Sequence, residues 1–254
     1  MHEVIDSAIE VDRADSHPLV AAAGEHARIR LRPQALHTDA DGVTAEGLDE
    51  LAQRGLLNHL ASPAFGGAGL TRAEDRRIHE HLASGCLNTW LVWAQHAPLA
   101  RRIETSLTGI APAHELVEAL LSGRIVAGAA LSDVRRYPDR YIQAQRVAGG
   151  WSLNGTISWV SGWGVNSALL IAAVSPETEH VILALVPIDE RFVAEPLPLA
   201  ALGGQQDGAR LAPQRAGRGC PGARGATDRR LACGRSRRRR GRETAAVRAG
   251  LRGH

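Results

Sequence analysis

Two different periodicities divide the chain before residue 205. Up to about residue 124, apolar residues recur at the three- and four-residue spacing of amphipathic helices. From about residue 125, short apolar or alternating runs are separated by turn residues, which is the pattern of β-strands. We therefore predict an α+β fold, with a helical amino-terminal domain over residues 1–124 and a β domain over residues 125–204.

Capping residues mark the expected helix starts. Thr44 and Thr71 each precede an apolar-periodic segment, and Thr71 is followed by an acidic first turn. The Pro- and Gly-rich segment 62–70 predicts a turn and not a phosphate-binding loop, because no strand pattern precedes it. Helices are predicted over 44–60, 71–83, 87–103 and 113–123, the last one closed by Gly123.

The second domain consists of five short runs with turn signals between them. Their lengths predict a small antiparallel barrel or sandwich. The pair Asn154-Gly155 inside the third run is a tight-turn signal, and in a strand-rich run it also marks a bulge. Strands are predicted over 125–131, 141–147, 151–161, 167–174 and 180–188.

Candidate metal-binding or catalytic residues do not stand out in the helical domain. His79 and His81 are two residues apart, so on a helix they point away from each other and favour no metal site. His96, between Trp93 and Leu99, is typical of a buried structural histidine. The three cysteines form no CxxC pair, which argues against a zinc site or a disulfide framework.

Composition excludes several classes of protein. All 30 basic residues counted as Lys+Arg are Arg, and a chain without Lys forms neither a Schiff base nor a P-loop of the GKS/T type. The apolar runs 168–174 and 181–188 are far shorter than the roughly 18 residues that cross a bilayer. The start, MHEVIDSAIEVD, lacks the pattern of a secretory signal, so we expect a cytoplasmic location and no membrane association.

The segment 205–254 differs sharply from the rest. It holds fourteen Arg against three acidic residues and no aromatic residue, so we predict a disordered basic tail. The run 235–242, RSRRRRGR, is typical of a nucleic-acid-binding arm or of a solvated charge run. When this segment is back-translated with GC-rich codons and read in a shifted frame, its composition is more like that of a globular protein than the written sequence is. We therefore favour the hypothesis of a frameshift near residue 204 over nucleic-acid binding.

Three of the five Trp lie in the segment 149–164, GGWSLNGTISWVSGWG. This segment, the PAFGGAG turn of the helical domain and the LSD sequence at 131–133 together resemble the acyl-CoA dehydrogenase family over about residues 20–204. The family's corresponding hairpin reads approximately GGYxLNGxKxWI(T/S). The resemblance implies the family's helical amino-terminal and middle β domains.

The resemblance implies FAD as cofactor and four residues that contact it. Trp159 and Ser161 match the aromatic–hydroxyl pair that lines the isoalloxazine ring. Leu131, through its backbone, and Ser132, through its hydroxyl, match the partners of the flavin pyrimidine edge. The alternative is that Trp159 is a core aromatic of the hairpin. We assign no catalytic residue.

For the whole family, the resemblance implies FAD-dependent α,β-dehydrogenation of an acyl-CoA by a homo-oligomer. The chain departs from the pattern at 134–140, where VRRYPDR replaces the family's substrate-contacting PxxGSD, and at Ile157, where the family has Lys. The family's carboxy-terminal helical bundle carries the catalytic Glu, and an Arg-rich segment stands in its place. We therefore expect the chain as written to bind FAD weakly or not at all and to lack turnover. The alternatives are a flavin-dependent monooxygenase of the same fold and a non-catalytic protein whose tail binds nucleic acid.

Overall fold

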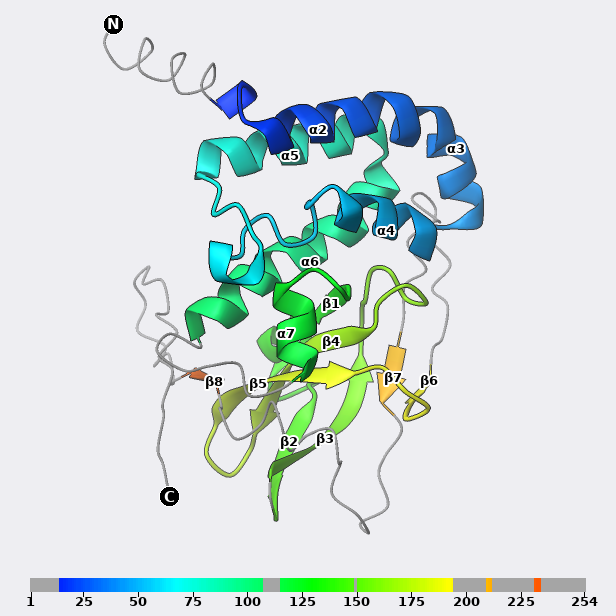
Figure 1. The fold of residues 1–254 in the computed structure, drawn as a ribbon. Helices are drawn as coiled ribbons and strands as arrows, with labels where there is room; N and C mark the ends of the chain where they lie inside the picture. Colours follow the sequence, from blue (N-terminus) through cyan, green and yellow to red (C-terminus); the bar gives the residue numbers. More distant parts are fainter. Residues whose placement is uncertain (1–13, 107–114, 149, 194–208, 212–230, 234–254) are drawn as a thin grey trace, which may run out of the picture.

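A computed structural model describes residues 14–106, 115–148, 150–193, 209–211 and 231–233 of the chain. Helices gather at one end of the molecule and a curled sheet at the other (Figure 1). Helix α6 (Leu87–Ser106) crosses between the two, and helix α7 (Glu115–Leu121) lies against the sheet. The predicted α+β organisation is confirmed.

The first long helical stretch of the described chain contains one wide turn. Helix α2 (Pro18–His26) runs into a π-helical turn (Ala27–Leu31) and then into α3 (Arg32–Asp41). The Arg32 amide donates to the carbonyl of Ala27, five residues earlier. The next residue, Pro33, has no backbone N–H and cannot donate the hydrogen bond of a regular α-helix. The wide turn therefore lies where the α-helical hydrogen bonding is interrupted.

Both predicted threonine caps are present. The Thr44 hydroxyl accepts from the Gly47 amide at 3.1 Å at the start of α4 (Ala45–Gln53). Thr71 and Glu74 form a complete capping box at the start of α5 (Arg72–Gly85). Helix α4 ends earlier than the predicted residue 60, because the chain turns at Gly55 with a φ of 72°.

The segment between α4 and α5 includes the predicted turn. It contains a short 3₁₀ helix at Pro63–Phe65. Gly67 follows it in close contact with the preceding chain, since a Cβ there would lie 2.1 Å from the carbonyl oxygen of Ala61. After α7 the chain leaves the helical half through Gly123, with a φ of 71°, as the sequence predicts.

The sheet is mixed, in the order β6-β7-β3-β2-β4-β5-β8, with β1 paired to β4 beside this path. Strands β1 to β5 lie in the five predicted runs. Four of them match their run closely, and β3 covers only the first part of the third run. The strands are β1 (Ala127–Ala130), β2 (Gln143–Val147), β3 (Gly150–Ile157), β4 (Ala168–Ser175), β5 (His180–Pro187), β6 (Phe192–Val193), β7 (Ala209–Leu211) and β8 (Leu231–Cys233).

The prediction of an antiparallel sheet is wrong for two strand pairs. Strand β1 runs parallel to β4 in the register Ala127↔Ala168, and β2 meets β4 in a parallel pair at Gln143↔Val174. The other pairs are antiparallel. The chain reaches β4 only after the β2–β3 hairpin, so the direction of β4 follows from the tertiary course of the chain and not from a local turn.

Asn154-Gly155 is not a tight turn, because β3 continues through both residues. Up to Asn154 the strand pairs with β2, and from Gly155 it pairs with β7. Gly155 has a φ of 149°, and a Cβ there would lie 3.0 Å from the Cα of Ile142. The glycine therefore marks an irregular point at which the strand exchanges one partner for another.

Apolar side chains form one core in the helical half and two around the sheet. Every residue of β4 is buried, as expected for a strand covered on both faces. One of the sheet cores joins Leu99 and Ile103 of α6 and Leu120 of α7 to Leu170 of β4 and Leu185 of β5. Helix α6 is thus packed into both halves of the molecule, and its position is set by each of them.

In the segment 205–254, for which we predict disorder, the structure describes the two three-residue strands β7 and β8. The other residues of this segment lie outside the described residues. The structure therefore does not test the hypotheses of a frameshift and of nucleic-acid binding, which concern those residues. Within the described ranges, no helix has the length and apolarity needed to span a membrane.

Candidate functional site

A cleft of about 700 Å³ opens where α6 meets the first strand of the sheet and the start of α5. Ala129 and Leu131, at the end of β1, form one part of its wall. Most of the remainder comes from one stretch of α6, residues 94–105, together with Leu60 and the first turn of α5. The full lining is Leu60, Arg72, Asp75, Ala94, Gln95, Pro98, Leu99, Arg101, Arg102, Thr105, Ala129 and Leu131.

Beside the cleft, a buried carboxylate joins two loops that are far apart in sequence. The Asp133 side chain is fully buried, and its Oδ2 accepts the Ser158 amide at 2.8 Å. The Ser158 hydroxyl donates to the other carboxylate oxygen and accepts from Arg136 at 3.0 Å. Because Ser132 precedes Asp133 and Trp159 follows Ser158, this contact brings the two predicted flavin-contacting segments together.

Trp159 is not a core residue of the hairpin, because 45% of it is exposed. Its indole is nevertheless held in place, since Nε1 donates to the hydroxyl of Ser161 at 3.1 Å. Ser161 itself is buried, and its carbonyl accepts from Asn166 Nδ2 at 2.8 Å. The arrangement presents an anchored aromatic ring to the outside of the sheet.

The loop that carries Trp159 and Ser161 is also fixed against α6. Gly162 has a φ of 79°, and a Cβ there would lie 2.7 Å from Cγ1 of Val92. Only glycine allows both this backbone conformation and this close approach. The loop is therefore held on two sides, by Asp133 at the end of β1 and by α6.

The four predicted residues divide between the cleft and its surroundings. Leu131 lines the cleft, whereas Ser132, Trp159 and Ser161 do not. The half-buried Ser132 hydroxyl has no hydrogen bond to any other described residue. An exposed indole and an available hydroxyl next to a cleft are groups that suit a planar, polar-edged ring system such as a flavin.

His96 is the buried structural histidine that the sequence predicts. Its Nδ1 accepts from the Ala127 amide at 3.1 Å, so Nε2 carries the proton and donates to the Leu57 carbonyl at 2.9 Å. Complete burial lowers the pKa of His96 to about 4, since no water solvates the charged ring. The neutral ring thus connects the α4–α5 segment, helix α6 and strand β1.

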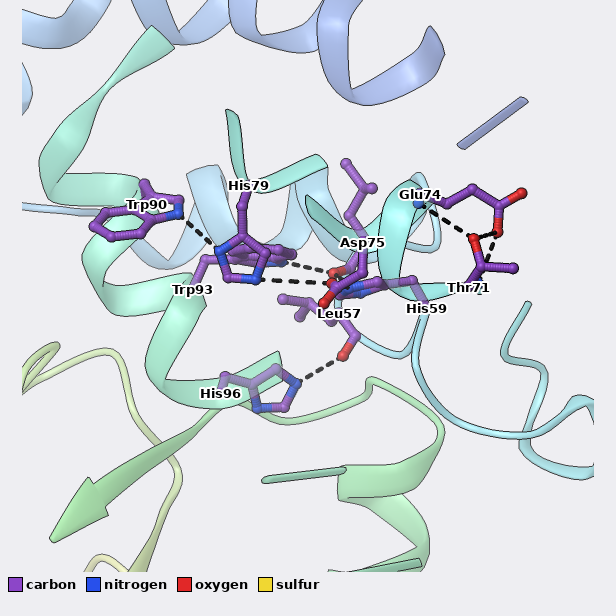
Figure 2. A network of polar contacts seen from close by, with 10 residues as sticks. Leu57, His59, Thr71, Glu74, Asp75, His79, Trp90, Trp93 and His96 are labelled. Carbon is purple, nitrogen blue, oxygen red and sulfur yellow. Dashed lines mark hydrogen bonds and ion pairs between the residues drawn. The ribbon is translucent and has the colours of Figure 1, made fainter. Parts of the chain in front are cut away.

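A polar network near the cleft was not anticipated from the sequence (Figure 2). Asp75 Oδ1 lies 3.0 Å from Nε2 of the buried His59 and 3.7 Å from Nε2 of His79. Nδ1 of His79 accepts from Nε1 of Trp90 at 3.0 Å, and the His59 and Trp93 rings are stacked with centroids 5.2 Å apart. Burial lowers the pKa of His79, which is therefore neutral near pH 7. Within the described residues, no group of three or more His, Cys, Asp or Glu is arranged to hold a metal ion.

The comparison with known families gives a match in the first half of the chain. The family model described as "Acyl-CoA dehydrogenase, N-terminal domain" matches residues 13–106. The resemblance to acyl-CoA dehydrogenases is confirmed. It covers the amino-terminal and middle parts of the chain, since the structural neighbours extend it into the sheet.

The fold is shared with several solved structures at low sequence identity. A glutaryl-CoA dehydrogenase from Mycobacterium smegmatis, in complex with FADH2, has a TM-score of 0.65 at 18% identity over 80% of this chain and 54% of its own. Butyryl-CoA dehydrogenase from Megasphaera elsdenii gives 0.64 at 15% identity, over 76% and 54%. The 3-HSA hydroxylase from Rhodococcus sp. RHA1 gives 0.60 at 17% identity, over 78% and 50%.

The chain spans about half the length of these solved structures. At such identities the likeness defines the fold and leaves activity and substrate to be argued from the site. None of the curated proteins compared with the chain matches it.

Proposed function

We propose that the chain forms the flavin-facing part of an FAD-dependent oxidoreductase of the acyl-CoA dehydrogenase type, acting on an acyl-CoA. The observation that carries this proposal is the contact between Asp133 and Ser158. It places the Leu131-Ser132 segment beside the exposed, anchored indole of Trp159. Among the described residues, Trp159 is the one Trp, Tyr or Phe that is exposed.

In this proposal, bound FAD supplies the acceptor for a hydride. Trp159 covers one face of the ring, and Ser161 keeps the indole in position. The Ser132 hydroxyl and the Leu131 backbone donate hydrogen bonds to the polar edge of the ring, where negative charge develops on reduction. The contact between Asp133 and Ser158 holds these two segments together.

The cleft is suited to the acyl-CoA. Ala94, Pro98, Leu99 and Ala129 give it an apolar wall that an acyl chain contacts without losing hydrogen bonds. Arg72, Arg101 and Arg102 line the same cleft and supply positive charge for an anionic ligand such as a CoA thioester. Dehydrogenation also requires a base for the α proton, and we assign that role to no described residue.

In the first experiment the chain as written is titrated with FAD, and binding is measured from the quenching of flavin fluorescence. We expect weak, saturable binding that Trp159→Leu and Ser132→Ala each weaken by roughly three- to tenfold, the worth of one aromatic contact or hydrogen bond. Val193→Ala, at another exposed apolar residue, and Ser152→Ala, at a partly exposed serine of β3, serve as matched controls. Equal effects of the site variants and the controls on this binding would contradict the proposal.

The second experiment addresses turnover. We expect the chain as written not to reduce bound flavin when an acyl-CoA is added, because the base and the opposite wall of the family's site lie in its carboxy-terminal bundle. Bleaching of the flavin absorbance by a saturated acyl-CoA would overturn this expectation. In an intact enzyme of this type we further propose a homo-oligomer and a cytoplasmic location.

The structural similarity to the 3-HSA hydroxylase favours a second candidate, a flavin-dependent monooxygenase of the same fold. Such an enzyme uses reduced flavin and oxygen and needs no base for an α proton. Oxygen consumption with a flavin reductase, in the absence of any reaction between acyl-CoA and an electron acceptor, would favour this candidate over the dehydrogenase.

A further inference from the structure

His59 and Asp75 share one proton in the wall of the cleft. Nδ1 of His59 lies 3.0 Å from the Leu56 carbonyl oxygen, which only accepts, so Nδ1 carries a proton. Nε2 lies 3.0 Å from Asp75 Oδ1. A second proton must lie between these two atoms, because neither a bare nitrogen nor a bare carboxylate oxygen donates.

Two neighbouring rings fix the position of this pair. The stacked ring of Trp93, at an interplanar angle of 17°, presents its electron-rich face to the imidazole. The neutral His79 carries its proton on Nε2 and directs it toward the same Asp75 oxygen from 3.7 Å. Oδ1 of Asp75 therefore lies against both His59 and His79, and Figure 2 draws these contacts as dashed lines.

The other carboxylate oxygen is available to the cleft. The Asp75 side chain is 25% exposed and lines the cleft. Within the described chain, no hydrogen bond reaches Oδ2. Asp75 is also the only acidic side chain in the lining, which otherwise contains three arginines and uncharged residues. A fixed carboxylate oxygen of this kind accepts hydrogen bonds and donates none.

We propose that Asp75, fixed by His59, is a hydrogen-bond-accepting subsite that selects ligands carrying a hydroxyl group. A ligand in the cleft donates its hydroxyl hydrogen to Oδ2, while the proton shared with His59 stays in place. Asp75 touches the ligand and His59 is the positioning residue. The subsite requires no flavin, so the proposal stands or falls independently of the proposed oxidoreductase function.

The test uses three small probes of similar shape with the full chain at pH 7. Phenol donates and accepts a hydrogen bond, anisole only accepts, and toluene does neither. Binding is followed by NMR at millimolar probe concentrations, with ¹⁵N-labelled histidine to locate the site. We expect phenol to bind about tenfold more tightly than anisole and toluene, as for a partly exposed hydrogen bond to a charged group. The His59 signals should shift with phenol and much less with toluene.

Asp75→Ala, which removes both accepting oxygens, should reduce this preference to about one, whereas Glu46→Gln, which removes an exposed acid from α4, should leave it unchanged. If anisole binds as tightly as phenol, the arginines recognise the ligand oxygen and the proposal is wrong. Equal binding of all three probes by the unaltered chain also overturns it, whether or not Asp75→Ala folds. Preference for phenol without a shift at His59 places the subsite elsewhere and has the same consequence.

Discussion

Acidification should unfold this protein in part through one residue, His96. The ring is fully buried, donates to the Leu57 carbonyl and accepts from the Ala127 amide, so both nitrogens are satisfied only when it is neutral. A second proton on Nδ1 would face the Ala127 N–H in the absence of water. The perturbation we consider is therefore protonation of His96, compared with the variant His96→Gln, whose amide also donates and accepts but does not titrate.

The magnitude follows from the difference between the pKa values of the two states. Folding lowers the pKa of His96 from 6.5 to about 4, so the unfolded chain binds the proton more tightly than the folded one. The contribution of His96 to stability is fully present above pH 6.5 and is lost as the pH falls toward 4. The loss amounts to about 2 kcal/mol at pH 5 and approaches about 3 kcal/mol near pH 4.

The assay is urea unfolding of both proteins at a series of pH values, followed by circular dichroism. Other groups titrate in both proteins, among them His26 and His79, whose pKa values are lowered mainly by burial. The difference between the two curves of unfolding free energy against pH therefore gives the contribution of His96 alone. We expect a difference that is constant between pH 7 and 8 and declines below pH 6.5. A constant difference down to pH 4.5 would refute the assignment of His96 as a buried neutral ring.

Three further predictions concern the segments that hold the site. Gly162→Ala should destabilise the protein by about 2–4 kcal/mol in urea unfolding, from a positive φ and a clash with α6, whereas Gly69→Ala, with open space around its Cβ, should cost only about 1 kcal/mol. Asp133→Ala should cost about 3 kcal/mol by the same assay and also weaken FAD binding, because Ser158 loses its partner for two hydrogen bonds. Thr71→Ala should lower the thermal midpoint by an amount equivalent to about 1 kcal/mol without changing FAD binding. Equal costs for the two glycine variants, or unchanged FAD binding in Asp133→Ala, would contradict the corresponding argument.

Local signals in the sequence predict the elements well and their pairing poorly. The caps at Thr44 and Thr71 depend on residues within four positions, so the sequence is sufficient to locate them. The parallel pairing of β1 with β4 depends on where the chain returns after the β2–β3 hairpin, and no local pattern contains that information. At Asn154-Gly155 the sequence predicts a tight turn or a bulge, and no local pattern shows that β3 exchanges partners at this glycine.

The candidate site shows the same limit. The resemblance directs attention to Leu131, Ser132, Trp159 and Ser161, but the contact that joins them is made by their neighbours Asp133 and Ser158, which lie 25 residues apart. His59 and Asp75 are 16 residues apart, on opposite sides of an irregular segment, so no periodicity relates them. The contacts of Asp133 with Ser158 and of Asp75 with His59 both depend on tertiary packing, which a pattern of residues in the sequence does not contain.

The two proposed sites adjoin one cleft and are fixed by different contacts, which makes them separable by experiment. Asp133 and Gly162 hold the loop of Trp159 against the end of β1 and against α6. His59 and the first turn of α5 hold Asp75 on another part of the wall. Disruption of Asp133 should therefore weaken flavin binding and preserve the preference for phenol, whereas Asp75→Ala should do the reverse. His96 packs beneath both regions through Leu57 and Ala127, so its protonation should weaken the two together.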